Sequence, residues 1–184
     1  YAVVALVNLG SMKDPQTEWR PAVSNEAVTI DLGAVRDVDR ITYFTGIGSG
    51  RLLLELSDDG VEFHRVNEEQ FDHASVFKWQ RYDINDAGRY LRIVSADGII
   101  ALREVGVQAD GEWLAIEPDE TNAALLDEQD TIPERPGYEN STYFDEIYHA
   151  RTAYEHLNGI VPYENTHPPL GKVFIMIGVW IFGM

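Results

Sequence analysis

Residues 51–66 read RLLLELSDDGVEFHRV, two largely apolar runs that flank Asp58-Asp59-Gly60. An aspartate–glycine pair between alternating apolar and polar residues is typical of a tight hairpin turn, because glycine accepts the positive φ that such turns require. The stretch therefore predicts two short strands paired antiparallel. It is the clearest indication of fold class in the chain.

The same alternation extends outward on both sides of this hairpin. Upstream, it appears in EAVTIDLGAV (26–35) and in DRITYFTGIGSG (39–50), which ends in three glycines. Downstream, RYLRIVSADGIIALREVGVQADG (89–111) repeats it around another Asp-Gly pair. Short strands with turns every ~8–12 residues and no helical periodicity predict a mainly β fold, an antiparallel β-sandwich over residues 10–116.

The composition narrows the classes of function. The 184 residues suit one domain, and 14 Lys+Arg against 31 Asp+Glu give a net charge of −17. A nucleic-acid partner is excluded, because phosphate binding needs a basic surface, and docking on anionic lipid head groups is disfavoured for the same reason. With no cysteine, the chain has neither disulfides nor a thiolate metal site.

Four short motifs occur in the β region in a fixed order: Asp31-Leu32-Gly33, Ser57-Asp58-Asp59-Gly60, Arg89-Tyr90-Leu91-Arg92-Ile93 and Arg103-Glu104-Val105. In this order they resemble the discoidin family (coagulation factor 5/8 type C domains). The resemblance implies a jelly-roll sandwich of the galactose-binding-like fold, whose loops at one end commonly bind sugars or lipid head groups. The cysteines that often close such domains are missing here.

No family motif assigns the ligand residues, so candidates come from side-chain chemistry. Trp19, Arg20 and the Gly46–Arg51 loop with Arg51 are the expected exposed groups. Aromatic faces stack on sugar rings, and a guanidinium fork bonds to hydroxyls. The alternative is that these residues are structural and the sandwich binds nothing.

Residues 117–140 have a different composition, with eight carboxylates, the single basic residue Arg135 and prolines at 118, 133 and 136. Such a segment has little to bury and repels itself, so we expect a solvated acidic linker. A calcium site is the alternative, but the Asp-x-Asp-x-Asp-Gly spacing is absent.

An amphipathic helix is expected after the linker. Thr142 and Asp145 have the spacing of a helix N-terminus, and Asn158-Gly159 supplies a stop. One face carries apolar residues: Tyr143, Ile147, Ala150, Tyr154 and Leu157. The other carries Asp145, His149, Thr152 and His156. This second face suits proton acceptance by a carboxylate that the helix dipole keeps ionised, or it is simply solvated. A metal held by Asp145 and His149 is a further reading, with only two ligands.

The C-terminal stretch HPPLGK (167–172) precedes an apolar run, 173–184, that covers every side of a helix. A membrane span needs about 20 apolar residues, so we interpret this run as the start of a transmembrane helix. In that case Lys172 would lie at head-group depth. A buried core helix is the alternative. Residues 1–9 are read either as the end of another transmembrane helix or as a first strand.

The motif Phe144-Asp145-Glu146, followed by His167-Pro168-Pro169-Leu170-Gly171-Lys172 before an apolar helix, resembles the protein O-mannosyltransferase family (GT-C fold, glycosyltransferase family 39). The resemblance covers residues 141–184. It implies a multi-pass cell-membrane enzyme that moves a sugar, mannose in that family, from a polyprenyl-phosphate carrier to a Ser/Thr hydroxyl. Residues 141–172 would be its extracytoplasmic catalytic loop.

Carried over by motif, Asp145 is the expected general base and Glu146 supports it or a divalent cation. No other cofactor is expected. His167 and Lys172 would lie near the carrier phosphate. The expected partners are therefore a polyprenyl-phosphate sugar, an acceptor protein or glycan, and membrane lipid. The segment alone is expected to be inactive. The alternative is a membrane-tethered carbohydrate-binding module without catalysis.

Overall fold

The structure is a computed structural model that describes residues 13–183, so the expectations for residues 1–9 lie outside the described part. The strands are β1 (Glu26–Ser57), β2 (His64–Phe71), β3 (Trp79–Ala109) and β4 (Glu112–Trp113). All their pairings are antiparallel, in the order β2-β1-β3-β4. The expectation of a mainly β, antiparallel fold is confirmed.

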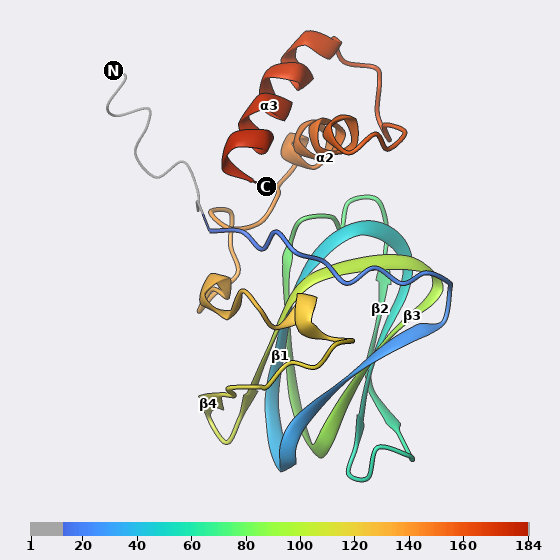
Figure 1. Ribbon diagram of the computed structural model, residues 1–184, viewed down its shortest axis with the longest axis vertical. Helices are drawn as coiled ribbons and strands as arrows, with labels where there is room; N and C mark the ends of the chain where they lie inside the picture. The colour runs from blue at the N-terminus through green and yellow to red at the C-terminus, as the bar shows by residue number, and fades with distance from the viewer. Residues whose placement is uncertain (1–12, 184) are drawn as a thin grey trace.

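The two long strands, β1 and β3, bend so that each contributes to two layers (Figure 1). In one layer, residues 26–31 of β1 pair with 90–95 of β3, and residues 50–56 pair with β2. In the other, residues 36–44 of β1 pair on one side with 79–88 and on the other with 104–109. Bends and register shifts let one strand pass between layers, as in sandwiches with strands that switch sheets.

The core lies between these layers, because alternate residues of each strand face inward. Its fully buried side chains include Ile30, Ile41, Leu54, Leu91 and Ile93. The hairpin predicted at Asp58-Asp59-Gly60 is present: β1 ends at Ser57, β2 begins at His64, and Gly60 has a φ of 75°.

The acidic segment 117–140 is not a fully solvated linker. It forms two short 3₁₀ turns, η1 (Ala123–Leu125) and η2 (Gln129–Thr131). Leu125 and Leu126 are buried against the sandwich core, and the Asn122 amide donates to the Thr29 carbonyl oxygen at 3.1 Å. Two leucines among eight carboxylates were enough to dock the segment, because burial of each contributes about 1.5–3 kcal/mol.

Two helices, α2 (Asp145–Leu157) and α3 (Pro169–Phe182), pack on each other beyond one end of the sandwich (Figure 1). Helix α2 begins three residues later than the predicted Thr142 start. The Thr142 hydroxyl donates instead to the Val76 carbonyl oxygen at 2.6 Å. The backbone N–H of Thr142 donates to the Phe77 carbonyl oxygen at 2.9 Å. These bonds tie the residues before α2 to the loop between β2 and β3.

A second hydrophobic cluster joins α2 to the sandwich. Its members are Phe44, Ile47, Val76, Phe77, Trp79 and Ile147, with Ile132 and Tyr154 packed against them. The Phe77 and Tyr154 rings meet edge to face at 5.3 Å, and the Arg103 guanidinium lies 4.9 Å and 5.0 Å from these rings. The sandwich and α2 are therefore one packed body.

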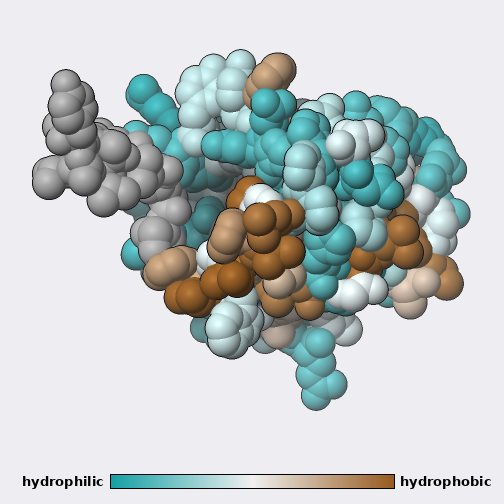
Figure 2. Space-filling model, turned by 90° about the horizontal axis from the view of Figure 1, so that it is seen from above, coloured by the Kyte–Doolittle hydropathy of each residue, from teal (hydrophilic) through white to brown (hydrophobic). Residues whose placement is uncertain are grey.

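Helix α3 presents most of its apolar side chains to the exterior, and hydrophobic residues form a central band in the view from above (Figure 2). The exposed large hydrophobic residues of α3 are Leu170, Val173, Phe174, Ile175, Ile177, Trp180, Ile181 and Phe182. Within residues 13–183, no helix is both long and apolar enough to cross a membrane. The transmembrane start at 173–184 stays a prediction.

Candidate functional site

Asp145 is the first residue of α2 and is exposed. In the described part of the chain, no hydrogen bond or ion pair engages its carboxylate. Glu146, next to it, accepts a hydrogen bond from the Tyr143 N–H at 3.0 Å. Glu146 thus caps the first turn of the helix and leaves Asp145 as the unengaged carboxylate.

The residue before Asp145 has an unusual backbone. Phe144 has φ 49° and ψ −116°, and its side chain is 70% exposed. A bulky L-residue in this region costs about 1–3 kcal/mol, and such strain gathers at functional sites. The strained turn fixes the direction in which the chain enters α2.

Glu164 organises the segment that leads into α3. Its carboxylate accepts from the Thr166 N–H at 2.6 Å and hydroxyl, and it lies 3.1 Å from the His167 Nδ1. It also pairs with the Lys172 ammonium, which donates to the Glu164 carbonyl oxygen at 2.8 Å as well. These hydrogen bonds hold the pKa of Glu164 far below its usual range, and the bond from Lys172 has the largest effect.

Lys172 is only 2% exposed, and its ammonium is bonded to both the carbonyl oxygen and the carboxylate of Glu164. The sequence suggested an ammonium free to meet a lipid phosphate. In this structure it would have to leave Glu164 first. His167, with its side chain 54% exposed, is the more accessible of the two predicted phosphate-binding groups.

Helix α2 contacts the segment that carries the second motif through His149 and Thr152. The rings of His149 on α2 and His167 lie 4.8 Å apart, and the Thr152 hydroxyl donates to the Glu164 carbonyl oxygen at 3.3 Å. His149, taken from the sequence as a face residue only, therefore touches the second motif. Asp145, Glu146, His167 and Lys172 all belong to this one pair of packed helices and the segment between them.

The polar residues of α2 include a buried ion pair that the helical pattern did not reveal. Arg151 Nε donates to Glu155 Oε1 at 2.7 Å, and both side chains are under a tenth exposed. Arg151 also donates to the His73 carbonyl oxygen, and the Tyr163 N–H donates to Glu155 at 2.7 Å. The signal available in the sequence was the i, i+4 spacing of opposite charges.

The candidate sugar-binding residues have separate contacts in the structure. Trp19 is half-buried against the core and its backbone pairs with Leu102. Arg20 is exposed, 3.9 Å from Glu18. The Arg51 guanidinium pairs with two carboxylates: its Nη1 lies 2.7 Å from Glu68 Oε1, and its Nε donates to Asp97 Oδ2 at 2.6 Å. Among residues 13–183 no hydrogen bond, ion pair or ring contact joins Arg51 to Trp19 or Arg20.

The loop predicted at residues 46–51 is wrong: these residues lie within strand β1 and pair with β3, and their glycines have a packing reason. A Cβ at Gly48 would lie 2.2 Å from the Ile99 carbonyl oxygen, and one at Gly98 would lie 2.0 Å from that of Ser49. Two backbone segments cross here in contact, which only glycine permits. This close approach accounts for the glycines without a ligand.

Two acidic clusters lie outside the α2–α3 region. Glu104, Asp127 and Glu128 have carboxylate oxygens within 4.8 Å of one another, a spacing that could hold a metal ion. Glu104 is fully buried, and desolvation raises its pKa to about 8. Glu128 accepts the N–H groups of Gln16 and Thr17 at 2.7 and 3.0 Å, so internal hydrogen bonds already engage it. Glu146, the predicted cation neighbour, is not a member.

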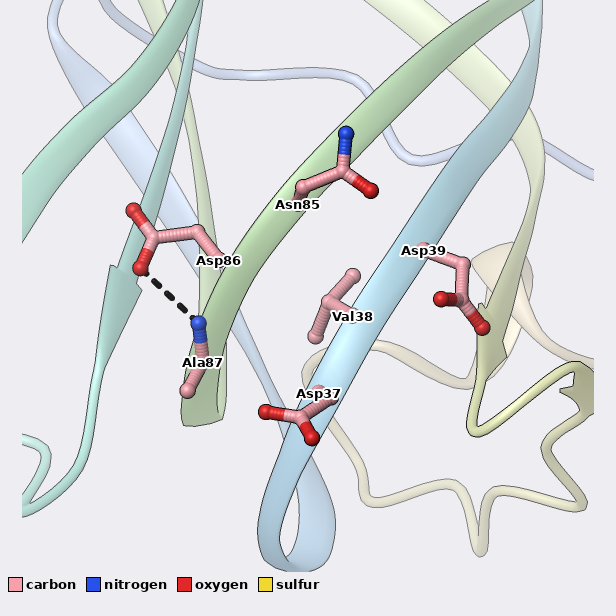
Figure 3. Close-up of a pocket in the computed structure, with 6 residues that line it drawn as sticks. All are labelled: Asp37, Val38, Asp39, Asn85, Asp86 and Ala87. Atoms are coloured by element: carbon pink, nitrogen blue, oxygen red, sulfur yellow. Dashed lines mark hydrogen bonds between the residues drawn. The ribbon is translucent and has the colours of Figure 1, made fainter.

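The second acidic group lines a pocket between β1 and β3, with Asp37, Asp39 and Asp86 around Val38 (Figure 3). Their carboxylates point away from one another (Figure 3). Asp39 accepts from the Gly111 N–H at 2.7 Å, and Asp86 lies 3.0 Å from His64 Nε2. The arrangement does not converge on a single ion.

No protein-family model matches this chain, nor does any curated protein match it significantly. Solved structures similar to it include the CBM32 domain of AlyQ in complex with 4,5-unsaturated mannuronic acid: 18% identity, TM-score 0.46, covering 55% of this chain and 87% of that one. CpGH89CBM32-5 from Clostridium perfringens, in complex with GalNAc-β-1,3-galactose, has 20% identity and a TM-score of 0.43, covering 54% and 78%.

The C-terminal domain of a chitobiase from Bacteroides fragilis is 18% identical, with a TM-score of 0.44 over 60% of this chain and 78% of that one. At such identities and TM-scores, what this chain does has to be argued from its own side chains.

Proposed function

We propose that this chain is an extracytoplasmic segment of a membrane glycosyltransferase that moves a sugar, mannose by the family resemblance, from a polyprenyl-phosphate carrier to a hydroxyl of an acceptor protein. The observation that supports the proposal is the packing of α2, which begins at the unengaged Asp145, against α3 and the segment before it. In that contact the ring of His149 on α2 lies 4.8 Å from the ring of His167.

In this proposal Asp145 accepts the proton of the acceptor hydroxyl as that oxygen attacks the anomeric carbon. The bond between this carbon and the carrier phosphate breaks, and the polyprenyl phosphate leaves with inversion at the carbon. His167 faces the leaving phosphate, and positive charge there stabilises the developing anion. Glu146 and Glu164 position other residues: Glu146 caps the first turn of α2, and Glu164 holds the turn that contains His167.

The exposed apolar side of α3 supports a membrane location for this segment, because a large uncovered apolar surface marks a membrane or protein contact. The remaining active-site groups would come from other parts of such an enzyme. The 184-residue chain alone is therefore expected to lack transferase activity.

The test is Asp145→Asn in the full-length protein that carries this segment, with purified polyprenyl-phosphate sugar and an acceptor. Turnover should fall about 10²–10⁴-fold, since that is the usual contribution of a general base. Asp58→Asn, another exposed aspartate, is the matched control and should keep normal turnover. Unchanged turnover in Asp145→Asn would remove Asp145 as the base.

A second candidate function is carbohydrate binding by the sandwich without catalysis. The observation in its favour is Arg51, whose exposed guanidinium is held in place by Glu68 and Asp97. A guanidinium oriented by two carboxylates offers its remaining N–H groups, and the carboxylates their free lone pairs, to sugar hydroxyls.

This candidate is tested by titrating the chain with mannose, galactose and uronic-acid oligosaccharides. Binding that Arg51→Ala removes and Arg36→Ala keeps would establish a sugar site at Arg51. If no oligosaccharide binds at millimolar concentration, the second candidate is wrong.

A further inference from the structure

Segment 158–168 connects α2 to α3 (Figure 1), and it holds a carboxylate within a set of hydrogen-bond donors. Glu164 Oε1 accepts from the N–H of Thr166 at 2.6 Å and from the Thr166 hydroxyl. Glu164 Oε2 pairs with the Lys172 ammonium and lies 3.1 Å from His167 Nδ1. We propose that this donor set is a phosphate-binding site and that Glu164 is its internal competitor, which must rotate out before a phosphate can enter. The inference rests on the proposed function only for the assignment of that phosphate to the polyprenyl carrier.

The groups around Glu164 are of the kinds that bind phosphate oxygens in proteins. Thr166 offers a backbone N–H and a hydroxyl, and Lys172 offers an ammonium. The imidazole of His167 completes the set. Carboxylate and phosphate oxygens accept the same charge-assisted hydrogen bonds. A phosphate that displaces the carboxylate therefore takes over these bonds and leaves the buried ammonium paired with an anion.

The local sequence isolates this carboxylate. In residues 158–172 Glu164 is the only acidic residue and Lys172 the only Lys or Arg, although the whole chain has 31 acidic residues and a net charge of −17. Once the Glu164 side chain rotates away, no other carboxylate of this segment can pair with Lys172. A buried ammonium without a partner is costly, so the vacated position favours another anion.

The Glu164 side chain can leave its donors while the backbone keeps its place. The Glu164 carbonyl oxygen accepts from Lys172 Nζ at 2.8 Å and from the Thr152 hydroxyl at 3.3 Å, so two bonds hold the backbone independently of the carboxylate. The side chain of Lys172 is 3% exposed, whereas that of His167 is 54% exposed. An anion therefore reaches the site from the side of His167.

The competition determines how tightly a phosphate binds. Hydrogen bonds, above all the one from Lys172, lower the pKa of Glu164, so the competitor is ionised throughout the neutral range. If the open state is populated at about 1–10%, the apparent dissociation constant of the phosphate is raised about 10–100-fold. The same competition would speed release of the lipid phosphate after transfer, because the returning carboxylate takes back its donors.

The binding test uses the 184-residue chain with inorganic phosphate and, separately, with farnesyl phosphate, followed by NMR at Thr166 and His167. Glu164→Gln keeps the size of the side chain and removes its charge, so phosphate should bind at least about tenfold more tightly than in the natural chain. Glu62→Gln, at an exposed glutamate between β1 and β2, is the matched control and should leave the affinity unchanged. Glu164→Asp, whose shorter side chain keeps the charge, should give a smaller gain.

Three outcomes would overturn the inference. Equal affinity of the natural chain and Glu164→Gln would show that the carboxylate does not compete. The gain should disappear when His167→Ala is added to Glu164→Gln, and a gain that persists would place the phosphate elsewhere. A gain with farnesyl phosphate alone would mean that the apolar tail, and not the donor set, is bound. When both ligands gain, the tighter of the two identifies the source as lipid or free phosphate.

Turnover separates this inference from the proposed function. If Asp145→Asn abolishes transfer in the full-length protein but Glu164→Gln binds phosphate no more tightly, only the competition by Glu164 fails. If Glu164→Gln gains affinity for phosphate but Asp145→Asn is fully active, only the proposed function fails.

Discussion

At the scale of single residues, the most heavily used side chain in the site is Glu164, which no motif indicated. Its two oxygens and its carbonyl oxygen together engage Thr152, Thr166, His167 and Lys172. The residue acts by position: it determines where the His167 ring lies. A mutational study confined to the motif residues would miss it.

Under the proposed function, Glu164→Gln is therefore expected to reduce turnover of the full-length protein through His167. The amide keeps the shape of the side chain but loses the charge that holds Lys172. Breaking a shielded charge pair typically costs more free energy than breaking an exposed pair. The pH profile should change together with kcat, since the carboxylate no longer faces the imidazole. Glu62→Gln, at an exposed glutamate, serves as the control.

A second residue, Glu104, makes stability depend on pH. Its folded-state pKa is about 8 because burial disfavours the charge, against an ordinary value of 4.5. Between these values the folded chain binds more protons than the unfolded chain, so stability is complete below pH 4.5 and is lost as pH rises to 8. Asp127 and Glu128, which face Glu104, strengthen the effect.

The measurement is the free energy of unfolding by urea between pH 5 and 8. It should fall with rising pH in the natural chain and much less in Glu104→Gln. Asp14, whose pKa burial raises to about 6, titrates in the same window and leaves a residual slope. Glu112→Gln, at an exposed strand position, should not alter the slope. A natural chain with flat stability over this range would contradict the assignment.

At the scale of elements, α2 shows why periodicity located a helix but not its contacts. Ile147 and Tyr154 face the sandwich as their spacing predicted, yet Leu157 is exposed while Arg151 and Glu155 are buried. A pattern of apolar residues cannot reveal burial of charges that pair with each other. The predicted start at Thr142 was wrong because that hydroxyl found a partner in a loop distant in sequence.

Arg151→Ala should destabilise the chain by about 3–5 kcal/mol, because it leaves the Glu155 carboxylate buried without its partner. Arg65→Ala, which breaks the exposed pair with Glu68, should cost less than about 1 kcal/mol. Both values come from urea unfolding monitored by tryptophan fluorescence. Equal costs for the two variants would show that the α2 pair is not buried in solution.

The β region was the most predictable part, since turn residues and alternation act locally. Gly60 and the Asp97-Gly98 pair stood where the chain turns or crosses. The docking of 117–140 was not predictable, because composition averages two buried leucines with many exposed carboxylates. The site residues came from motif resemblance, whereas the contact of Glu164 with Thr152 depends on α2 packing against the segment before α3.

At the scale of the whole molecule, the sandwich and α2 are joined by the hydrophobic cluster around Phe77. Phe77→Ala should show this. It removes a buried ring that packs on Tyr154 and Arg103, at a cost of about 3–5 kcal/mol, and should speed amide hydrogen exchange in α2.

Phe71→Ala is the matched control: its ring is equally buried but packs on Tyr43 in the main core. It should lower global stability by a similar amount without a selective loss of protection in α2. Selective protection loss in both variants, or in neither, would mean that α2 does not depend on the Phe77 contact.

The buried ammonium at the start of α3 has a mechanical consequence. Lys172 lies on the first turn of α3 and pairs with the Glu164 carboxylate, which also contacts His167. Movement of α3 is therefore coupled through Glu164 to the position of the imidazole. A tilt of α3, or a shift of α3 by one turn, would move the His167 imidazole toward or away from the Asp145 carboxylate at the start of α2. In the proposed function, the distance between Asp145 and His167 would then depend on how α3 is held by its surroundings.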